Sequence, residues 1–168
     1  MSEKSVNEAV SFGARLAGSQ VFADLFRDGM ALVEETASYL DGPGRQESKK
    51  LERNAALAYA TESMRLTTRL MQLASWLLLH RAVKEGEMSL AQASREKAKV
   101  KLAAGDYADE QNIALLPERL RTLVERSKSL QRAVRRLDAT IHAPVTRTTR
   151  SNPVERQLGL LRAAFEPE

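Results

Sequence analysis

The stretch Glu62-Ser-Met-Arg-Leu-Thr-Thr-Arg-Leu-Met-Gln-Leu-Ala-Ser-Trp-Leu-Leu-Leu-His80 decides the fold of this chain. It carries two rows of mainly apolar residues at helical spacing, about 100° apart around the helix. The first row is Met64, Thr67, Met71, Ala74 and Leu78, and the second is Leu66, Leu70, Leu73 and Leu77. Because one apolar row needs one packing partner, two rows predict at least two partners. We therefore expect burial of Met71, Leu73, Ala74, Leu77 and Leu78.

The helix that contains this stretch is predicted to run from Gln46 to Glu85. No Gly or Pro falls between these two residues, and Gly86 follows where a C-terminal cap is needed. Such a helix has roughly 40 residues and a length of about 60 Å. A chain of 168 residues cannot surround a helix of that length as a sphere, so the sequence favours an elongated bundle or a dimer.

Two further helices are predicted to cover the long one. The first spans about 20–40, with Ser19 as its N-cap and Gly29 at a close approach to another backbone. A turn at 41–44 should lay it antiparallel to the long helix. The last helix starts at Pro117 and repeats apolar residues every three and four positions to His142.

Shorter segments complete the chain. Ser89 and Gln92 match a capping box that starts a helix over about 90–101, and 104–112 reads as a polar, acidic loop. Residues 1–18 look weakly structured. The predicted fold is all-α, an elongated three-helix bundle around one long central helix, with a bundle domain at 1–143 and a flexible C-terminal tail at 144–168.

Composition excludes several classes of protein. The chain has no cysteine, which excludes a disulfide framework, a zinc finger and a thiol nucleophile. Its longest unbroken apolar run, Trp76 to Leu79, is far shorter than a membrane span, and its first residues do not form a signal peptide. We therefore expect a cytoplasmic protein without membrane insertion.

His80 is the most tempting candidate for chemistry. An exposed histidine on a helical bundle can accept phosphate, which makes a histidine phosphotransfer-like signalling bundle the alternative function. However, Lys84 and Gly86 do not have the spacing expected of such a helix, so a solvated or partly packed histidine near a helix end is favoured. His142 is read as a cation at a helix C-terminus. The two histidines look isolated, so we expect no catalytic residue, no cofactor and no bound metal.

The net charge of +4 belongs to the C-terminal third. Residues 117–168 hold 11 Lys and Arg against 6 Asp and Glu, and most of the basic residues before His142 lie on the outer face of the last helix. This face could contact phosphates. Since it lacks aromatic residues for stacking and a helix-turn-helix turn, no direct nucleic-acid binding is expected.

Several long blocks of the sequence resemble the RcdA family, bacterial regulators of the degradation of CtrA. The blocks are Phe12-Gly13, Ser19–Phe22, Gly29–Arg45, Tyr59–Leu79, Arg81–Met88, Leu116-Pro117 and Arg136–Asp138. The resemblance implies a homodimer of three-helix bundles with a mobile tail and no enzyme activity. It also implies an adaptor that helps the ClpXP protease, primed by another adaptor, to destroy cell-cycle regulators such as the response regulator CtrA. A further adaptor that binds cyclic di-GMP and a location at a cell pole are implied as well.

The resemblance places partner binding in the tail, between Arg156 and Phe165. The predicted partner-binding residues are Arg156, Leu158, Leu160, Leu161 and Phe165. Leu158, Leu161 and Phe165 fall at spacings of three and four, as on one face of a short helix that folds on a partner. A solvated tail, or a helix that docks back on its own bundle, remains the alternative.

Overall fold

The computed structural model describes residues 19–99, 110–142 and 157, and the elements of these segments are helices. Their bounds are α2 (Gln20–Asp41), α3 (Pro43–Lys49), α4 (Arg53–Lys84), α5 (Leu90–Lys99), α6 (Glu110–Ala114) and α7 (Glu118–Ile141). The all-α prediction is therefore confirmed. No helix in the described segments is long and apolar enough to cross a membrane.

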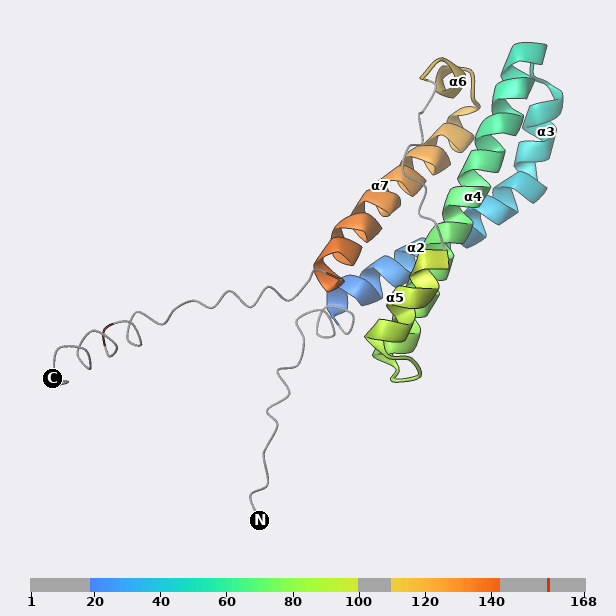
Figure 1. The fold of residues 1–168 in the computed structure, drawn as a ribbon. Coiled ribbons are helices and arrows are strands. Elements are labelled where there is room, and N and C mark those ends of the chain that lie inside the picture. The colour runs from blue at the N-terminus through green and yellow to red at the C-terminus, as the bar shows by residue number, and fades with distance from the viewer. Residues whose placement is uncertain (1–18, 100–109, 143–156, 158–168) are drawn as a thin grey trace, which may run out of the picture.

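Helices α2, α4 and α7 form a three-helix bundle (Figure 1). Phe22 near the start of α2 lies against Trp76 late in α4, so these two helices are antiparallel as predicted. Helices α4 and α7 run in the same direction, because Arg69 pairs with Ser127 and Trp76 pairs with Asp138. The chain must therefore return from the end of α4 to the start of α7 (Figure 1). This parallel arrangement brings the C-terminal ends of α4 and α7 together.

The predicted helix ends are largely confirmed by their caps. The Ser19 hydroxyl accepts a hydrogen bond from the Phe22 amide at 3.4 Å. Ser89 and Gln92 exchange both bonds of a capping box, at 3.0 and 3.1 Å. Gly86 has φ of 76°, a left-handed conformation that glycine adopts without a steric cost, and so ends α4.

The prediction of one helix from Gln46 to Glu85 is wrong at its N-terminal end. Residues 43–49 form the separate helix α3, and α4 begins only at Arg53. The Tyr39 hydroxyl donates a 2.5 Å hydrogen bond to Glu47, which ties α3 back to α2. A Cβ on Gly44 would lie 2.7 Å from the Tyr59 hydroxyl oxygen. These contacts with α2 and α4 hold α3 in a place that a continuous helix could not occupy. With 32 residues, α4 is therefore about 48 Å long and shorter than the predicted helix.

Burial in the core confirms the predicted packing of the second row of α4 and of the whole apolar row of α7. Leu66, Leu70, Leu73 and Leu77 are all buried. The predicted row of α7 is buried along its full length, at Leu120, Leu123, Val124, Ser127, Leu130, Val134, Leu137 and Ile141. Gly29 lies at a close approach, as predicted, but the neighbour is a side chain and not a backbone: a Cβ there would lie 2.5 Å from a Leu77 methyl carbon.

The first row of α4 is not buried, which corrects part of the prediction. Met71 is 66% exposed and Leu78 is 53% exposed, while Ala74 is intermediate. Only Leu73 and Leu77 of the five expected residues lie in the core. The all-leucine row takes both intramolecular partners, α2 and α7, and leaves the row that contains methionine and threonine on the outside.

Candidate functional site

His80 lies in the interior at the C-terminal end of α4, and the prediction of a solvated or partly packed side chain is wrong. Its exposed fraction is 0%. The imidazole stacks on Trp76, one helical turn earlier, with ring centroids 4.0 Å apart and planes 20° from parallel. Its Nδ1 lies 2.9 Å from the Trp76 carbonyl oxygen. Since a carbonyl oxygen only accepts, Nδ1 carries the proton, and Nε2 of the neutral ring presents a lone pair.

The second histidine of the chain meets this lone pair. The Nε2 atoms of His80 and His142 are 2.9 Å apart, and the two rings are nearly perpendicular. His142 is the C-terminal cap of α7, so the pair joins the ends of α4 and α7. The two histidines are therefore not isolated, and the premise of the no-metal prediction is wrong.

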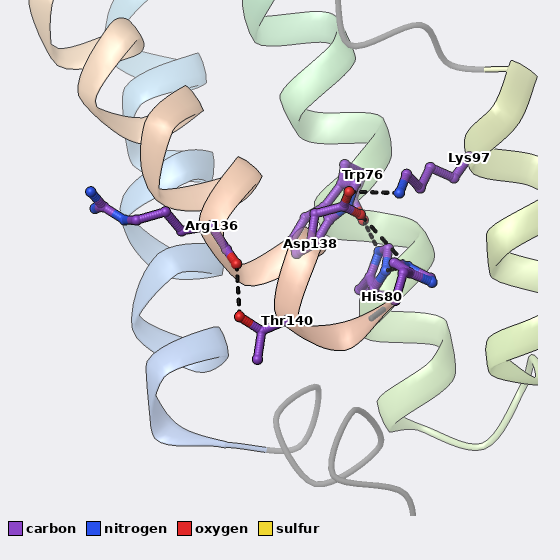
Figure 2. Close-up of polar contacts among 7 residues, drawn as sticks. Trp76, His80, Lys97, Arg136, Asp138 and Thr140 are labelled. Atoms are coloured by element: carbon purple, nitrogen blue, oxygen red, sulfur yellow. Dashed lines mark hydrogen bonds and ion pairs between the residues drawn. The ribbon is translucent and has the colours of Figure 1, made fainter. Parts of the chain in front are cut away.

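Asp138 completes the cluster from the last turn of α7 (Figure 2). Its carboxylate accepts a 2.8 Å hydrogen bond from the Trp76 indole nitrogen and a 2.6 Å bond from the Lys97 ammonium group of α5. Its Oδ1 lies 3.6 Å from His142 Nε2. The cluster thus connects α4, α5 and α7 at one end of the bundle.

Burial controls the charge of both imidazoles. Desolvation lowers the pKa of His80 below its usual value, and the nearby His142 and Lys97 act in the same direction, while Asp138 opposes them. Desolvation also lowers the pKa of His142, with Lys97 as the next contribution. Both rings are therefore neutral at pH 7, as metal-binding imidazoles must be. A phosphate acceptor needs an exposed ring nitrogen, so the burial of His80 removes the support for phosphotransfer.

A second feature is an exposed apolar row on α4. Four large side chains at intervals of seven residues make up this open row: Leu57, Met64, Met71 and Leu78. Beside it, α2 and α4 form an apolar groove of about 360 Å³, lined by residues that include Val33, Ala37, Leu40, Leu70, Met71 and Ala74. Seven-residue spacing of apolar side chains is typical of a helix that packs against another helix.

The core also contains charged side chains that the sequence reasoning missed. Glu62 and Arg69 of α4 are buried, at 1% and 3% exposure. Arg69 donates a 2.8 Å hydrogen bond to the Ser127 hydroxyl, and Arg65 pairs with Glu62 at 2.8 Å. The signal that could have revealed them was Ser127, a polar residue inside the otherwise apolar row of α7.

The basic face of α7 is partly engaged within the molecule. Arg126 forms an ion pair with Glu35 of α2, and Arg119 lies over the Tyr39 ring at 5.4 Å. Arg121 donates to the backbone carbonyl of Leu116 at 3.1 Å. The absence of direct nucleic-acid binding stays a prediction. The predicted partner-binding residues Arg156, Leu158, Leu160, Leu161 and Phe165 lie outside the described residues.

Comparisons with known proteins define the class of this helical bundle. Residues 13–165 match a protein family described as "Protein of unknown function (DUF1465)", and the chain belongs to this family. No curated protein matches the sequence. Among solved structures, the chain is similar to RcdA from Caulobacter crescentus CB15, with 49% sequence identity and a TM-score of 0.63. The match covers 78% of this chain and 98% of that one, and it confirms the family resemblance found in the sequence.

Proposed function

We propose that this protein is a non-enzymatic adaptor that helps to deliver cell-cycle regulators to the ClpXP protease. The observation that carries the proposal is the 49% identity to RcdA over 98% of that protein's chain. The family resemblance implies the rest of the pathway: a priming adaptor on the protease, a further adaptor that binds cyclic di-GMP, and CtrA among the substrates. It also implies a cytoplasmic protein that is concentrated at a cell pole.

The chemistry of the described residues is consistent with a binding role. Both histidines take part in contacts inside the bundle, and the family resemblance carries no catalytic motif to this chain. Among the described residues, the open row of α4 and its neighbouring groove form an exposed apolar surface. Exposed apolar side chains gathered on one face mark sites of protein association.

A reconstituted degradation assay tests the proposal. Purified ClpXP, the priming adaptor, CtrA and the adaptor that binds cyclic di-GMP are combined with and without this protein, and the loss of CtrA is followed. We expect faster degradation only when the protein is present, at substoichiometric amounts relative to CtrA. Degradation at the same rate without it, at every ratio of the components, would contradict the adaptor role.

We also propose that the protein is a homodimer held together by the open row. A second α4 would bury Leu57, Met64, Met71 and Leu78 as a coiled-coil-like seam. Sedimentation at micromolar concentration should give twice the monomer mass of 18.7 kDa. Met71→Glu should give the monomer mass, whereas Leu115→Glu is the matched control because Leu115 is an exposed leucine outside the row. A monomeric wild type would refute this dimer.

The tail proposal needs a separate test. The segment from 156 to 165 is proposed to contact partner proteins through Leu158, Leu161 and Phe165, with Arg156 and Leu160 beside them. Leu161→Glu combined with Phe165→Glu should slow delivery of at least some substrates and leave the dimer mass unchanged. Full delivery of substrates by this variant would indicate that the partner-binding surface lies on the bundle and not in the tail.

A further inference from the structure

The cluster at the end of the bundle has the composition of a metal site. His80 Nε2, His142 Nε2 and a carboxylate oxygen of Asp138 all lie within 4.8 Å of one another. Two imidazole nitrogens and one carboxylate oxygen form a ligand set that zinc and cobalt bind well, while calcium and magnesium prefer oxygen ligands alone. The three side chains come from two helices whose ends the parallel topology has already brought together.

Two of the three separations between ligand atoms need only a small adjustment to accept an ion. In a tetrahedral site with bonds of about 2.0–2.1 Å, neighbouring ligand atoms lie roughly 3.3 Å apart. The histidine nitrogens are 2.9 Å apart, and His142 Nε2 is 3.6 Å from Asp138 Oδ1. A movement of a few tenths of an ångström therefore brings these two separations to the tetrahedral value. The third separation, between His80 Nε2 and the Asp138 carboxylate, is within 4.8 Å, so this carboxylate moves closer to His80 when the ion binds. His142 is the C-terminal cap of α7 rather than a residue of its interior, and its backbone N–H donates to the Asp138 carbonyl.

The groups around the cluster are those that orient metal ligands. The Trp76 carbonyl fixes the proton of His80 on Nδ1, and so aims the Nε2 lone pair into the cluster. The Trp76 indole and Lys97 hold the Asp138 carboxylate by its two oxygens. Metal-binding histidines and carboxylates commonly have such hydrogen bonds on their far side.

An ion can reach the cluster from solvent, and no cysteine thiolate competes for it. The side chains of His142 and Asp138 keep 13% and 15% of their surface exposed, which leaves room for water at a fourth position. The whole chain has two histidines and no cysteine, so this cluster is the one place where a single chain can offer two imidazole ligands.

We propose that His80, Asp138 and His142 bind one divalent transition-metal ion, with a water molecule as fourth ligand. The ion replaces the proton between the two histidines, and His142 turns to its Nδ1-protonated form so that both Nε2 lone pairs face the metal. Bound metal joins the C-terminal end of α4 to the C-terminal end of α7. The site is structural.

Metal titration of the full-length, tag-free protein tests this inference. After treatment with a chelator, the protein is titrated with zinc chloride by calorimetry and with cobalt chloride by visible absorption. We expect one ion per chain with a dissociation constant below about 100 µM. Cobalt should give the intense visible bands of a tetrahedral site with nitrogen ligands. Zinc should also raise the melting temperature, since it binds the folded state.

The variant His142→Gln separates the site from general metal binding. It keeps a polar side chain at the helix cap and removes one ligand, so affinity should fall by at least ~100-fold and the zinc-dependent rise in melting temperature should disappear. Asp28→Asn, which removes an exposed carboxylate of α2, is the matched control and should bind as the wild type does. His80 is a poorer choice because its replacement could unfold the core.

Three results would overturn the inference. The first is zinc binding weaker than about 100 µM, and the second is a cobalt spectrum like that of the hydrated ion. The third is equal affinity in the wild type and in folded His142→Gln. The cobalt spectrum of the wild type decides the matter even if the variant does not fold.

Discussion

Leu77→Ala should be among the most destabilising single substitutions in the bundle. Leu77 is fully buried, and one of its methyl carbons lies only 2.5 Å from the position that a Cβ on Gly29 would take. Buried Leu→Ala changes cost roughly 2–5 kcal/mol, with larger values where the cavity cannot collapse. Gly29 has no side chain to fill the space, so we expect a cost of about 4 kcal/mol.

Gly29→Ala provides a second arm for the same experiment. As a single change, Gly29→Ala crowds Leu77, which should lower the free energy of unfolding by ~1–3 kcal/mol. The better helix propensity of alanine offsets this loss by up to ~1 kcal/mol. Combined with Leu77→Ala, the new methyl group enters the space that the leucine has left. The double variant should therefore be more stable than the sum of the two single changes predicts, by at least ~1 kcal/mol.

The measurement is urea unfolding followed by circular dichroism and by the fluorescence of the single tryptophan, Trp76. All variants are made in the Met71→Glu background, so that dissociation of a dimer does not contribute. Leu78→Ala is the control because Leu78 is the next leucine and is exposed, and it should change stability by less than ~0.5 kcal/mol. A Leu77→Ala cost below that value, or strictly additive effects of Gly29→Ala and Leu77→Ala, would refute the packing argument.

Three further outcomes are expected. Tyr39→Phe should lower the free energy of unfolding, measured in urea, by ~1.5–3 kcal/mol, because it removes the hydroxyl that donates to the Glu47 carboxylate. An unchanged free energy of unfolding would mean that this hydrogen bond does not hold α3 in place. Glu35→Gln should cost less than ~1 kcal/mol, since both partners of its ion pair are more than 40% exposed, and a larger loss would contradict a surface role. Truncation after Ala143 should preserve the helical circular dichroism signal, the melting temperature and the dimer mass, but it should lower substrate delivery. A sharply lower melting temperature would show that the predicted domain boundary at 143 is wrong.

The register of α7 and most helix ends were predictable because their signals are local. Pro117 starts α7 and the three-and-four spacing continues without a gap to Ile141, so only one face can be apolar. Ser89 and Gln92 satisfy each other within one turn. The break before Arg53 was not predictable, because the stretch from 46 to 85 has no Gly or Pro, and the contacts that hold α3 come from Tyr39 and Tyr59.

The site depends on contacts between distant parts of the sequence. His80 and His142 are separated by 62 residues, and their meeting requires α4 and α7 to be parallel. Nothing near either histidine indicates that topology. The choice between the two rows of α4 was similarly open, since both rows are mostly apolar. The stronger hydrophobicity of four leucines over a row with a threonine was the signal that could have decided it.

The two rows of α4 give this helix two separable tasks. The leucine row is closed by α2 and α7, and the buried Arg69–Ser127 hydrogen bond fixes how α4 and α7 align along their length. The open row contributes little to that core, because Met71 and Leu78 keep more than half of their surface in solvent. A charged residue in the open row should therefore change association while the bundle stays folded. If the open row is the assembly surface, folding and assembly use different faces of one helix, so the protein can exchange partners without losing its structure, as the proposed adaptor role requires.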